Sequence, residues 1–296
     1  MTPITARKTG ILFLVGLWFC WGFSYPATKI ILRELDIWTS RTLIMGAAGI
    51  LLLILAFITK KTLKVPKKYY SDLIIAAFLN MTIFQICMTL GVHFFSAGRT
   101  VVIVYTMPLW AILFAWLLLD ESPPLSRLIA LIMGVSGLAV LLSQDFSHLY
   151  SPGLGALCTI IGAISFGLGT VWMKRRVWEN DPTVIAGWQL IIGTIPLIPF
   201  WMLMGTETPW TDLRLVTWGN FIFLIIIANV LAYFLWFRIL QIFPASVSGL
   251  GTLAVPIVGI IASALILGEI IGAHELIALG LIVSALALNL KHPDLK

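Results

Sequence analysis

The sequence predicts an all-α integral membrane protein whose ten transmembrane helices form two inverted five-helix repeats around a central cavity. Three observations support this fold class. Of the 296 residues, 60% are hydrophobic and only 11% are charged, too few to cover the surface of a soluble domain. Apolar runs long enough to cross about 30 Å of hydrocarbon recur along the whole chain. Finally, one segment of the first half recurs in the second half.

Helices, rather than barrel strands, form the predicted spans. Inside a bilayer only helices and closed barrels satisfy every backbone hydrogen-bonding group. Barrel strands would alternate apolar and polar side chains, whereas runs such as 50–58 and 111–119 are continuously apolar. The first apolar stretch is longer than a signal peptide and is expected to remain as a helix. The predicted spans are 10–31, 38–58, 71–93, 98–119, 126–143, 153–173, 183–204, 217–237, 245–267 and 273–290.

The distribution of positive charge predicts the orientation of the spans. With the N-terminus in the cytoplasm, fourteen of the 19 Lys and Arg residues fall on the cytoplasmic side and five on the outer side. The positive-inside rule therefore predicts that both termini are cytoplasmic, in the inner (plasma) membrane of a bacterium. The five residues on the outer side are Lys29, Arg33, Arg41, Arg99 and Arg214.

An internal repeat predicts the domain organisation. Residues 95–142 align without a gap on residues 243–290, and we expect two domains, 1–148 and 149–296. Because each would hold five spans, the second enters the membrane from the opposite side, the arrangement that alternating access uses. Matches among Leu and Ile carry little weight, but a fixed spacing of proline and glutamate carries more. These matched pairs are Pro108 with Pro256 and Glu121 with Glu269.

Several short motifs carry a family resemblance. Trp21-Gly22 lies in the first span and Tyr105-Thr106-Met107-Pro108-Leu109-Trp110 in the fourth, which ends in Leu119-Asp120-Glu121. The second half repeats that ending as Leu267-Gly268-Glu269. In these motifs the chain resembles the drug/metabolite transporter superfamily, in particular the EamA-type exporters. The resemblance implies ten helices around a central cavity and secondary transport of small metabolites, commonly efflux of amino acids or related compounds.

Polar and aromatic side chains inside the spans are the candidates for contact with a small-molecule substrate, because polar groups are costly in hydrocarbon. Gln85 and Thr89 share one helix face, where hydrogen bonding between helices is an equally good interpretation. Arg99 suits a substrate carboxylate, but an arginine reaching for the outer interface fits as well. The predicted substrate-binding residues are Trp21, Tyr25, Gln85, Thr89, Arg99, Thr106, Trp110, Ser165, Gln189, Asn229 and Tyr233.

Aromatic residues divide into two groups. Most of the twelve tryptophans lie near span ends and are typical of interfacial belts. Trp21 lies near the middle of the first span. A cavity lined by Trp21, Tyr25 and Tyr233 would favour flat apolar or cationic groups.

Two prolines and two glutamates mark the ends of the repeated segments. Pro108 and Pro256 interrupt the hydrogen-bond ladder of corresponding spans and are the predicted hinges. Glu121 and Glu269 follow where those spans end, too far from the membrane centre for a coupling carboxylate. We expect them to cap the following helix or to stabilise a turn.

Other classes of protein fit the sequence less well. A membrane enzyme is not expected, because the chain lacks a His-Glu-x-x-His metal motif and a phosphate-binding glycine loop. No metal or cofactor is predicted, and the net charge of +6 has a topological explanation rather than a nucleic-acid one. A channel or facilitator for small polar solutes, or a scaffold, remains the alternative. The expected partners are the lipid bilayer and a small-molecule substrate; monomer and homodimer are both open.

Overall fold

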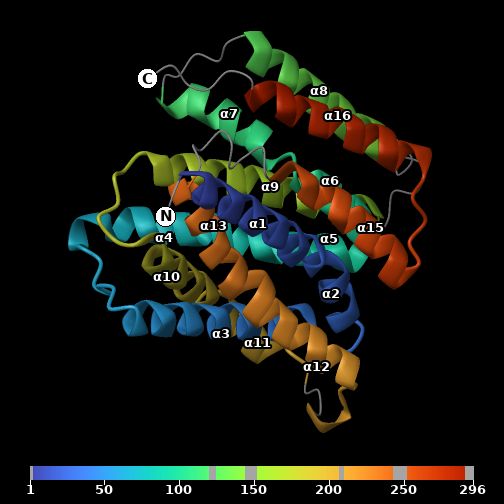
Figure 1. Ribbon diagram of the computed structural model, residues 1–296. Helices are drawn as coiled ribbons and strands as arrows, with labels where there is room; N and C mark the ends of the chain where they lie inside the picture. Colours follow the sequence, from blue (N-terminus) through green and yellow to red (C-terminus); the bar gives the residue numbers. More distant parts are fainter. Residues whose placement is uncertain (1–2, 120–124, 144–151, 207–209, 243–251, 291–296) are drawn as a thin grey trace.

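The computed structural model describes residues 3–119, 125–143, 152–206, 210–242 and 252–290, and every regular element in these ranges is helical (Figure 1). The prediction of an all-α chain is confirmed there. The elements of the first half are α1 (Pro3–Gly22), α2 (Ser24–Ile31), α3 (Ile37–Ile58), α4 (Tyr70–Ala77), α5 (Phe84–Phe94), α6 (Ala97–Val104), α7 (Met107–Leu119) and α8 (Leu125–Leu142). Those of the second half are α9 (Pro152–Lys174), α10 (Pro182–Thr194), α11 (Leu197–Met204), α12 (Leu215–Ile222), α13 (Ala232–Ile242), α15 (Val255–Leu267) and α16 (Ala273–Leu290).

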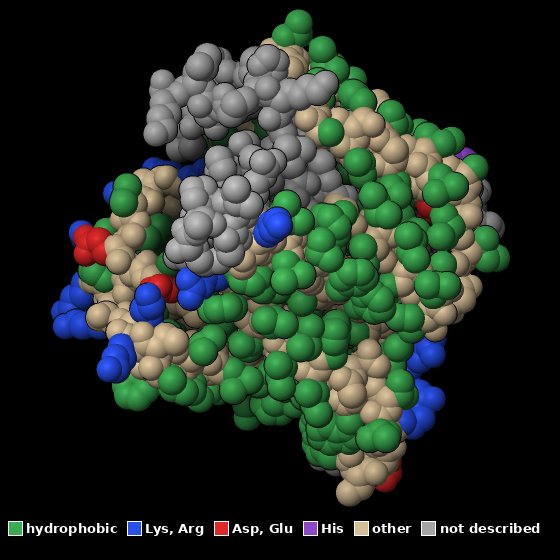
Figure 2. Space-filling view, viewed as in Figure 1, with side chains coloured by type: hydrophobic (Ala, Val, Ile, Leu, Met, Phe, Trp, Pro, Cys, Tyr) green, Lys and Arg blue, Asp and Glu red, His purple; other side chains and the backbone are tan. Residues whose placement is uncertain are grey.

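The helices have the length and composition of membrane spans. Six helical runs are long and apolar enough to cross a bilayer, or seven if α10 and α11, bent by 41°, count as one span. Three further apolar helices are shorter, so the predicted count of ten spans stays a prediction. Figure 2 shows hydrophobic side chains over the middle of one face, with Lys and Arg gathered toward its edges. This distribution is the one that a bilayer requires. The shorter helices are Leu128–Leu141, Val255–Leu267 and Ala273–Ala285.

Regular α-helix is interrupted within three of the predicted spans. The interruptions lie between α1 and α2 in the first span, between α6 and α7 in the fourth, and between α10 and α11 in the seventh, where alone the two helices are bent by 41°. A proline lies at or just after each interruption: Pro26, Pro108 and Pro196. Proline has no N–H to donate and disfavours helical geometry at the preceding residue. The interruption expected at Pro108 is therefore present.

Two π-helical turns interrupt the third and eighth spans, and the sequence analysis did not anticipate them. Phe78–Ile83 joins α4 to α5, and Phe223–Leu231 joins α12 to α13. Each contains a buried asparagine, Asn80 in the first and Asn229 in the second. A π turn leaves local backbone groups without their usual partners and occurs frequently at functional sites.

Helix packing joins the two halves through a regular set of pairs. α3 packs against α10, α6 against α15, and α8 against α16. α5 packs against α9 in the same way that α1 packs against α13. In Figure 1 the pair α8 and α16 lies along one edge, beyond α7. The short helix α6 lies at the centre of the largest buried cluster, where Val101, Val102 and Ile103 are fully buried.

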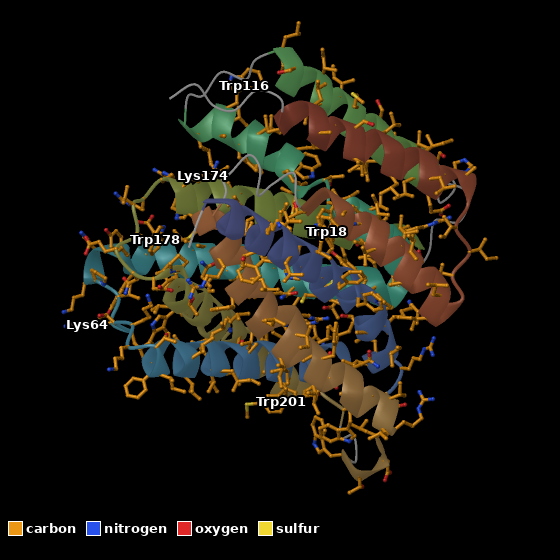
Figure 3. All side chains as sticks on the ribbon, viewed as in Figure 1. Trp18, Lys64, Trp116, Lys174, Trp178 and Trp201 are labelled. Atoms are coloured by element: carbon orange, nitrogen blue, oxygen red, sulfur yellow. The ribbon has the colours of Figure 1, made fainter. Side chains whose placement is uncertain are left out.

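The two ends of the helices are held together by different connections. We call the contacts among residues 29–36, 92–99, 205–206, 210–214 and 268–275 the Asp36 junction. We call the contacts among residues 59–72 and 174–183 the Asp181 junction. Lys64, Lys174 and Trp178 mark the side of the Asp181 junction in Figure 3.

Candidate functional site

The π turn Phe78–Ile83 is the point where several predicted residues meet. Ser165 of α9 donates a hydrogen bond to the Leu79 carbonyl (2.8 Å), and Gln189 of α10 accepts one from Asn80 (3.3 Å). The Tyr233 hydroxyl of α13 lies 3.6 Å from the sulfur of Met81. Helices of both halves thus converge on one turn. We call these groups, listed here, the interior polar cluster: Asn80, Ser165, Gln189 and Tyr233.

Asn80 was missed by the sequence analysis. It is 7% exposed, and its amide oxygen has no hydrogen-bond donor among the described residues. That oxygen faces Gly169 of α9, where a Cβ atom would lie only 2.0 Å from it, so the cluster is closed in this conformation. An asparagine in the middle of the predicted span 71–93 was a usable signal, because buried amides need partners.

Two other predicted polar residues donate side-chain hydrogen bonds to nearby backbone carbonyls. Thr89 is fully buried and its hydroxyl donates to the Gln85 carbonyl (2.6 Å). The Asn229 amide donates to the Leu224 carbonyl (2.6 Å) within its own π turn. Gln85 is 7% exposed on the next turn of the span after Met81. Thr89 and Asn229 therefore stabilise their helices, as hydrogen bonding within membrane bundles commonly does.

The predicted aromatic residues are distributed over separate clusters. Trp21 packs on Trp236, with ring centroids 5.9 Å apart. Tyr25 is 5% exposed in the cluster around α6, whereas Tyr233 packs with Met81 and Leu190 in another cluster. The structure therefore does not bring Tyr25 and Tyr233 into the one cluster that the sequence analysis expected.

Thr106, Trp110 and the two prolines lie at helix beginnings. The Thr106 hydroxyl donates to the Ile103 carbonyl (2.6 Å) and accepts from the Trp110 indole (3.2 Å). These two bonds connect the end of α6 to the beginning of α7. Pro108 and Pro256 each occupy the first turn of a helix, α7 and α15, where a missing N–H costs little. Their role as hinges stays a prediction.

Arg99 and Glu269 connect the two halves at the Asp36 junction. The Arg99 guanidinium donates to the Glu275 carboxylate of α16, and the side chains are 22% and 7% exposed. Glu269 accepts from the Ala97 and Gly98 amides, both at 2.8 Å. Of the two roles expected for Glu269, a helix cap or a turn, the cap of the following helix was wrong, because the carboxylate caps α6 of the other half. Glu121 lies outside the described residues.

The rest of the Asp36 junction also consists of polar contacts. Lys29 donates to carbonyls at the end of α5, including that of Phe95 (2.9 Å). Asp36 uses one carboxylate oxygen to cap α3 at the Thr39 amide (2.9 Å) and the other to accept from the Thr206 amide (3.1 Å). Glu34 accepts from Arg214. A small cavity of about 20 Å³ remains beside Arg99 and Glu269.

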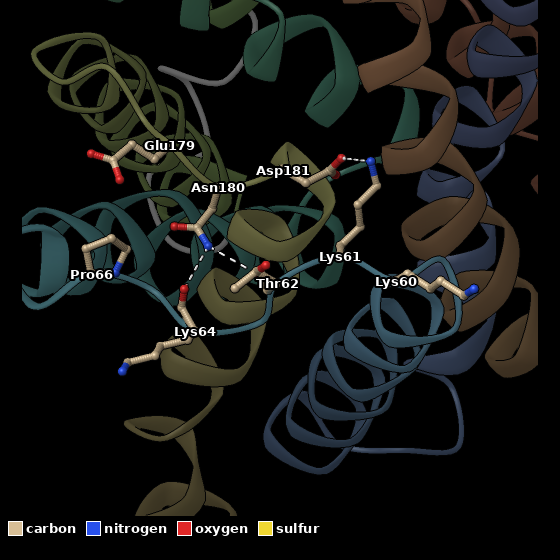
Figure 4. A pocket seen from close by; sticks show the side chains of 8 residues that line it. All are labelled: Lys60, Lys61, Thr62, Lys64, Pro66, Glu179, Asn180 and Asp181. Carbon is tan, nitrogen blue, oxygen red and sulfur yellow. Dashed lines mark hydrogen bonds and ion pairs between the residues drawn. The ribbon is translucent and has the colours of Figure 1, made fainter.

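The Asp181 junction repeats the use of a capping aspartate. Asp181 caps α10 at the Thr183 amide (2.9 Å) with one oxygen, and its other oxygen pairs with Lys61 at 2.9 Å (Figure 4). A wide cavity of about 590 Å³ opens beside this pair, with the Asn180 amide bonded to the Lys64 carbonyl (3.0 Å). The cavity is lined by Lys60, Lys61, Thr62, Lys64, Pro66, Glu179, Asn180 and Asp181.

The two capping aspartates have similar electrostatic environments. Burial alone would raise the pKa of Asp36, but hydrogen bonds from Thr39 and Thr206 outweigh it and hold the pKa below its ordinary value. Burial likewise opposes a lowered pKa at Asp181, where hydrogen bonds from Lys61 and Thr183 prevail. Both groups are therefore held as carboxylates. In the described ranges, no group of three or more His, Cys, Asp or Glu gathers in metal-binding geometry.

Comparison with known proteins gives a consistent result. The model of the EamA-like transporter family matches residues 8–143 and, separately, residues 153–291. The resemblance to the drug/metabolite transporters is thereby confirmed. The uncharacterized transporter YvbV of Bacillus subtilis (strain 168) is 32% identical over 293 residues, which is 97% of this chain and 93% of that protein.

More distant similarities cover nearly the full length as well. An Escherichia coli (strain K12) protein named "Probable amino-acid metabolite efflux pump" is 21% identical, over 96% of this chain and 95% of its own. One crystal structure superposes with a TM-score of 0.68 at 17% identity, covering 95% of this chain and 96% of the other. At that identity the superposition concerns the fold alone.

Proposed function

Because the chain belongs to the EamA-like transporter family, we propose that it is a secondary transporter that moves small metabolites by alternating access. The observation that carries the proposal is the pairing of the helices. Each of α3, α6 and α8 packs against the helix at the matching place in the other half, namely α10, α15 and α16. Such pairing is expected when two related halves exchange roles between an outward-open and an inward-open state.

Antiparallel contacts support the inverted repeat, with units 1–148 and 149–296. Asp36 at the beginning of α3 bonds to Thr206, just past the end of α11, while Lys61 beyond the end of α3 pairs with Asp181 at the beginning of α10. The Asp36 and Asp181 junctions would thus be equivalent ends of the two units. With both termini in the cytoplasm, the Asp36 junction faces outward and the Asp181 junction inward.

The interior polar cluster is the proposed substrate site. Asn80 offers a buried carbonyl oxygen that receives no hydrogen bond from the described part of the chain, and the neighbouring Gln189 and Tyr233 offer further polar atoms. An ammonium or hydroxyl group of a metabolite would supply the missing donor. The name of the Escherichia coli relative favours amino acids or related compounds and export across the inner membrane.

Counterflow in proteoliposomes tests the proposal. Purified protein is reconstituted in vesicles preloaded with unlabelled L-amino acids, and uptake of each labelled amino acid is followed. A carrier gives saturable, transient accumulation, whereas a channel gives unsaturated flux and no counterflow. We expect Asn80→Leu to abolish accumulation and Asn220→Leu, which changes an asparagine with an exposed amide, to leave it unchanged. Absence of counterflow with every amino acid would exclude this substrate class, and unsaturated flux would exclude the carrier.

A further inference from the structure

Arg41 is buried inside the protein without a charged partner. It belongs to α3, one turn beyond the Asp36 cap, and is only 3% exposed. One guanidinium nitrogen donates to the Thr28 hydroxyl of α2 (2.8 Å). The Nε atom is buried with no acceptor, and no carboxylate of the described ranges forms an ion pair with this residue.

Three other arginines have a carboxylate partner, which Arg41 lacks among the described residues. Arg99, Arg176 and Arg214 each donate to a carboxylate, and all three are more exposed than Arg41. Burying a guanidinium is costly unless an anion and further hydrogen bonds compensate it. A threonine hydroxyl supplies one neutral acceptor for five N–H donors. Arg41 is thus a buried positive charge that no carboxylate side chain of the described ranges compensates.

The position of Arg41 places it on the surface shared by the two halves. Arg41, Met45, Ala48 and Leu52 follow helical spacing on one face of α3. The last three pack in the cluster that also holds Met81 of the π turn, with Tyr233 against it. The face that carries Arg41 therefore continues to the interior polar cluster.

Thr28, the hydrogen-bond partner of Arg41, belongs to a helix that packs against the second half. It belongs to α2, the segment after the break in the first span, and α2 packs against α12 and α15 of the second half. Arg41 and Thr28 consequently lie between helices of both halves, close to the Asp36 junction. Helices that move relative to each other during alternating access would expose the guanidinium to the pathway.

We propose that Arg41 is an anion-binding residue of the transport pathway and that the transported metabolite carries a carboxylate or a similar planar oxyanion. This inference rests on the proposed function and narrows its substrate class. The chemistry follows from the guanidinium, whose parallel N–H groups match the two oxygens of a carboxylate. A carboxylate there would satisfy the unpaired Nε and neutralise the buried charge.

Thermal unfolding of the purified full-length protein in detergent tests the binding step. The probe is sodium acetate, titrated against sodium chloride at equal ionic strength. We expect acetate to raise the melting temperature of the wild type in a saturable manner. Arg41→Gln should raise the apparent Kd for acetate roughly tenfold to a hundredfold, as loss of a charged hydrogen bond predicts. Arg33→Gln is the matched control, because it removes the charge of an exposed arginine near the same end.

A structural role of Arg41 gives a different result. If Arg41→Met lowers the melting temperature without ligand by many degrees, the arginine holds the fold together and the proposal is wrong. Removal of an uncompensated buried charge should instead leave the melting temperature unchanged or raise it. The proposal is also overturned if acetate stabilises the wild type no more than chloride does, or stabilises Arg41→Gln equally.

Transport assays distinguish a failure of this inference from a failure of the proposed function. Counterflow of an amino acid but not of its methyl ester, lost in Arg41→Gln, supports both. Counterflow that persists in Arg41→Gln overturns the role of Arg41 and leaves the carrier intact. Arg41-dependent acetate binding in a protein without counterflow supports the anion site and contradicts the carrier.

Discussion

The Asp36 and Asp181 junctions hold the same two halves together, and the least exposed ion pair of the described residues lies at the Asp36 junction. At the Asp36 junction the pair of Arg99 and Glu275 has side chains 22% and 7% exposed. At the Asp181 junction the pair of Lys68 and Glu179 has side chains 60% and 58% exposed. Exposed pairs contribute little because water and salt screen them, whereas removing one partner of a buried pair is strongly destabilising.

This difference separates one ion pair, Arg99 with Glu275, from the others, whose basic partners are at least 47% exposed. The Asp36 junction joins α6 to α16 and to the connection after α15 by a charge pair and by the Glu269 cap. At the Asp181 junction, a wide cavity adjoins exposed lysines. We therefore expect loss of the Arg99–Glu275 pair to lower stability more than loss of the Lys68–Glu179 pair.

The largest effect is expected from Glu275→Gln. The change leaves the partly buried Arg99 without its carboxylate and should cost about 2 kcal/mol, less than the full cost of a wholly buried pair because Arg99 is partly exposed. The melting temperature in detergent measures it. The double variant Arg99→Gln with Glu275→Gln should recover part of the loss, because the two paired side chains are energetically coupled. Additive effects of the two changes would contradict this coupling.

An intermediate and equal effect is expected at the two capping aspartates. Asp36→Ala and Asp181→Ala each remove a helix cap and a contact with the other half, and each should cost about 1 kcal/mol. Asn at either position keeps a capping oxygen and should cost less. Melting temperatures of the four variants measure this. A loss at one position only would show that the junctions are not equivalent.

The pH dependence of stability tests the same two aspartates. Because folding lowers the pKa of both carboxyl groups, their contribution is present above the unfolded value and is lost as the pH falls through the folded value. Below about pH 4 the wild type should therefore lose stability more steeply than the double variant Asp36→Asn with Asp181→Asn. Identical slopes would mean that these groups do not gain from ionisation in the folded state.

The smallest effect is expected from Glu179→Gln. Its pair with Lys68 is exposed to solvent, so the melting temperature should not change beyond experimental error. Raising the salt concentration should likewise affect wild type and variant equally. A clear loss of stability would remove the distinction between the two junctions.

The sequence by itself determined those features that depend on a residue and its near neighbours. Long apolar runs predict membrane helices because hydrocarbon leaves the backbone few alternatives. A proline in the interior of a span cannot donate the usual helical hydrogen bond, so the interruption just before Pro108 was predictable. The order of motifs around Trp21 and Pro108 was also enough to find the family.

Only the tertiary structure decided which side chains meet. Glu269 caps a helix that begins about 170 residues earlier, and Ser165 bonds to the Leu79 carbonyl of a π turn in the other half. Arg41 resembles an interfacial arginine in the sequence, yet it is buried, and among the described residues its Nε atom has no acceptor. Apolar helices resemble one another, so local patterns cannot choose their neighbours. The partner of a polar group inside the bundle therefore depends on packing between distant segments.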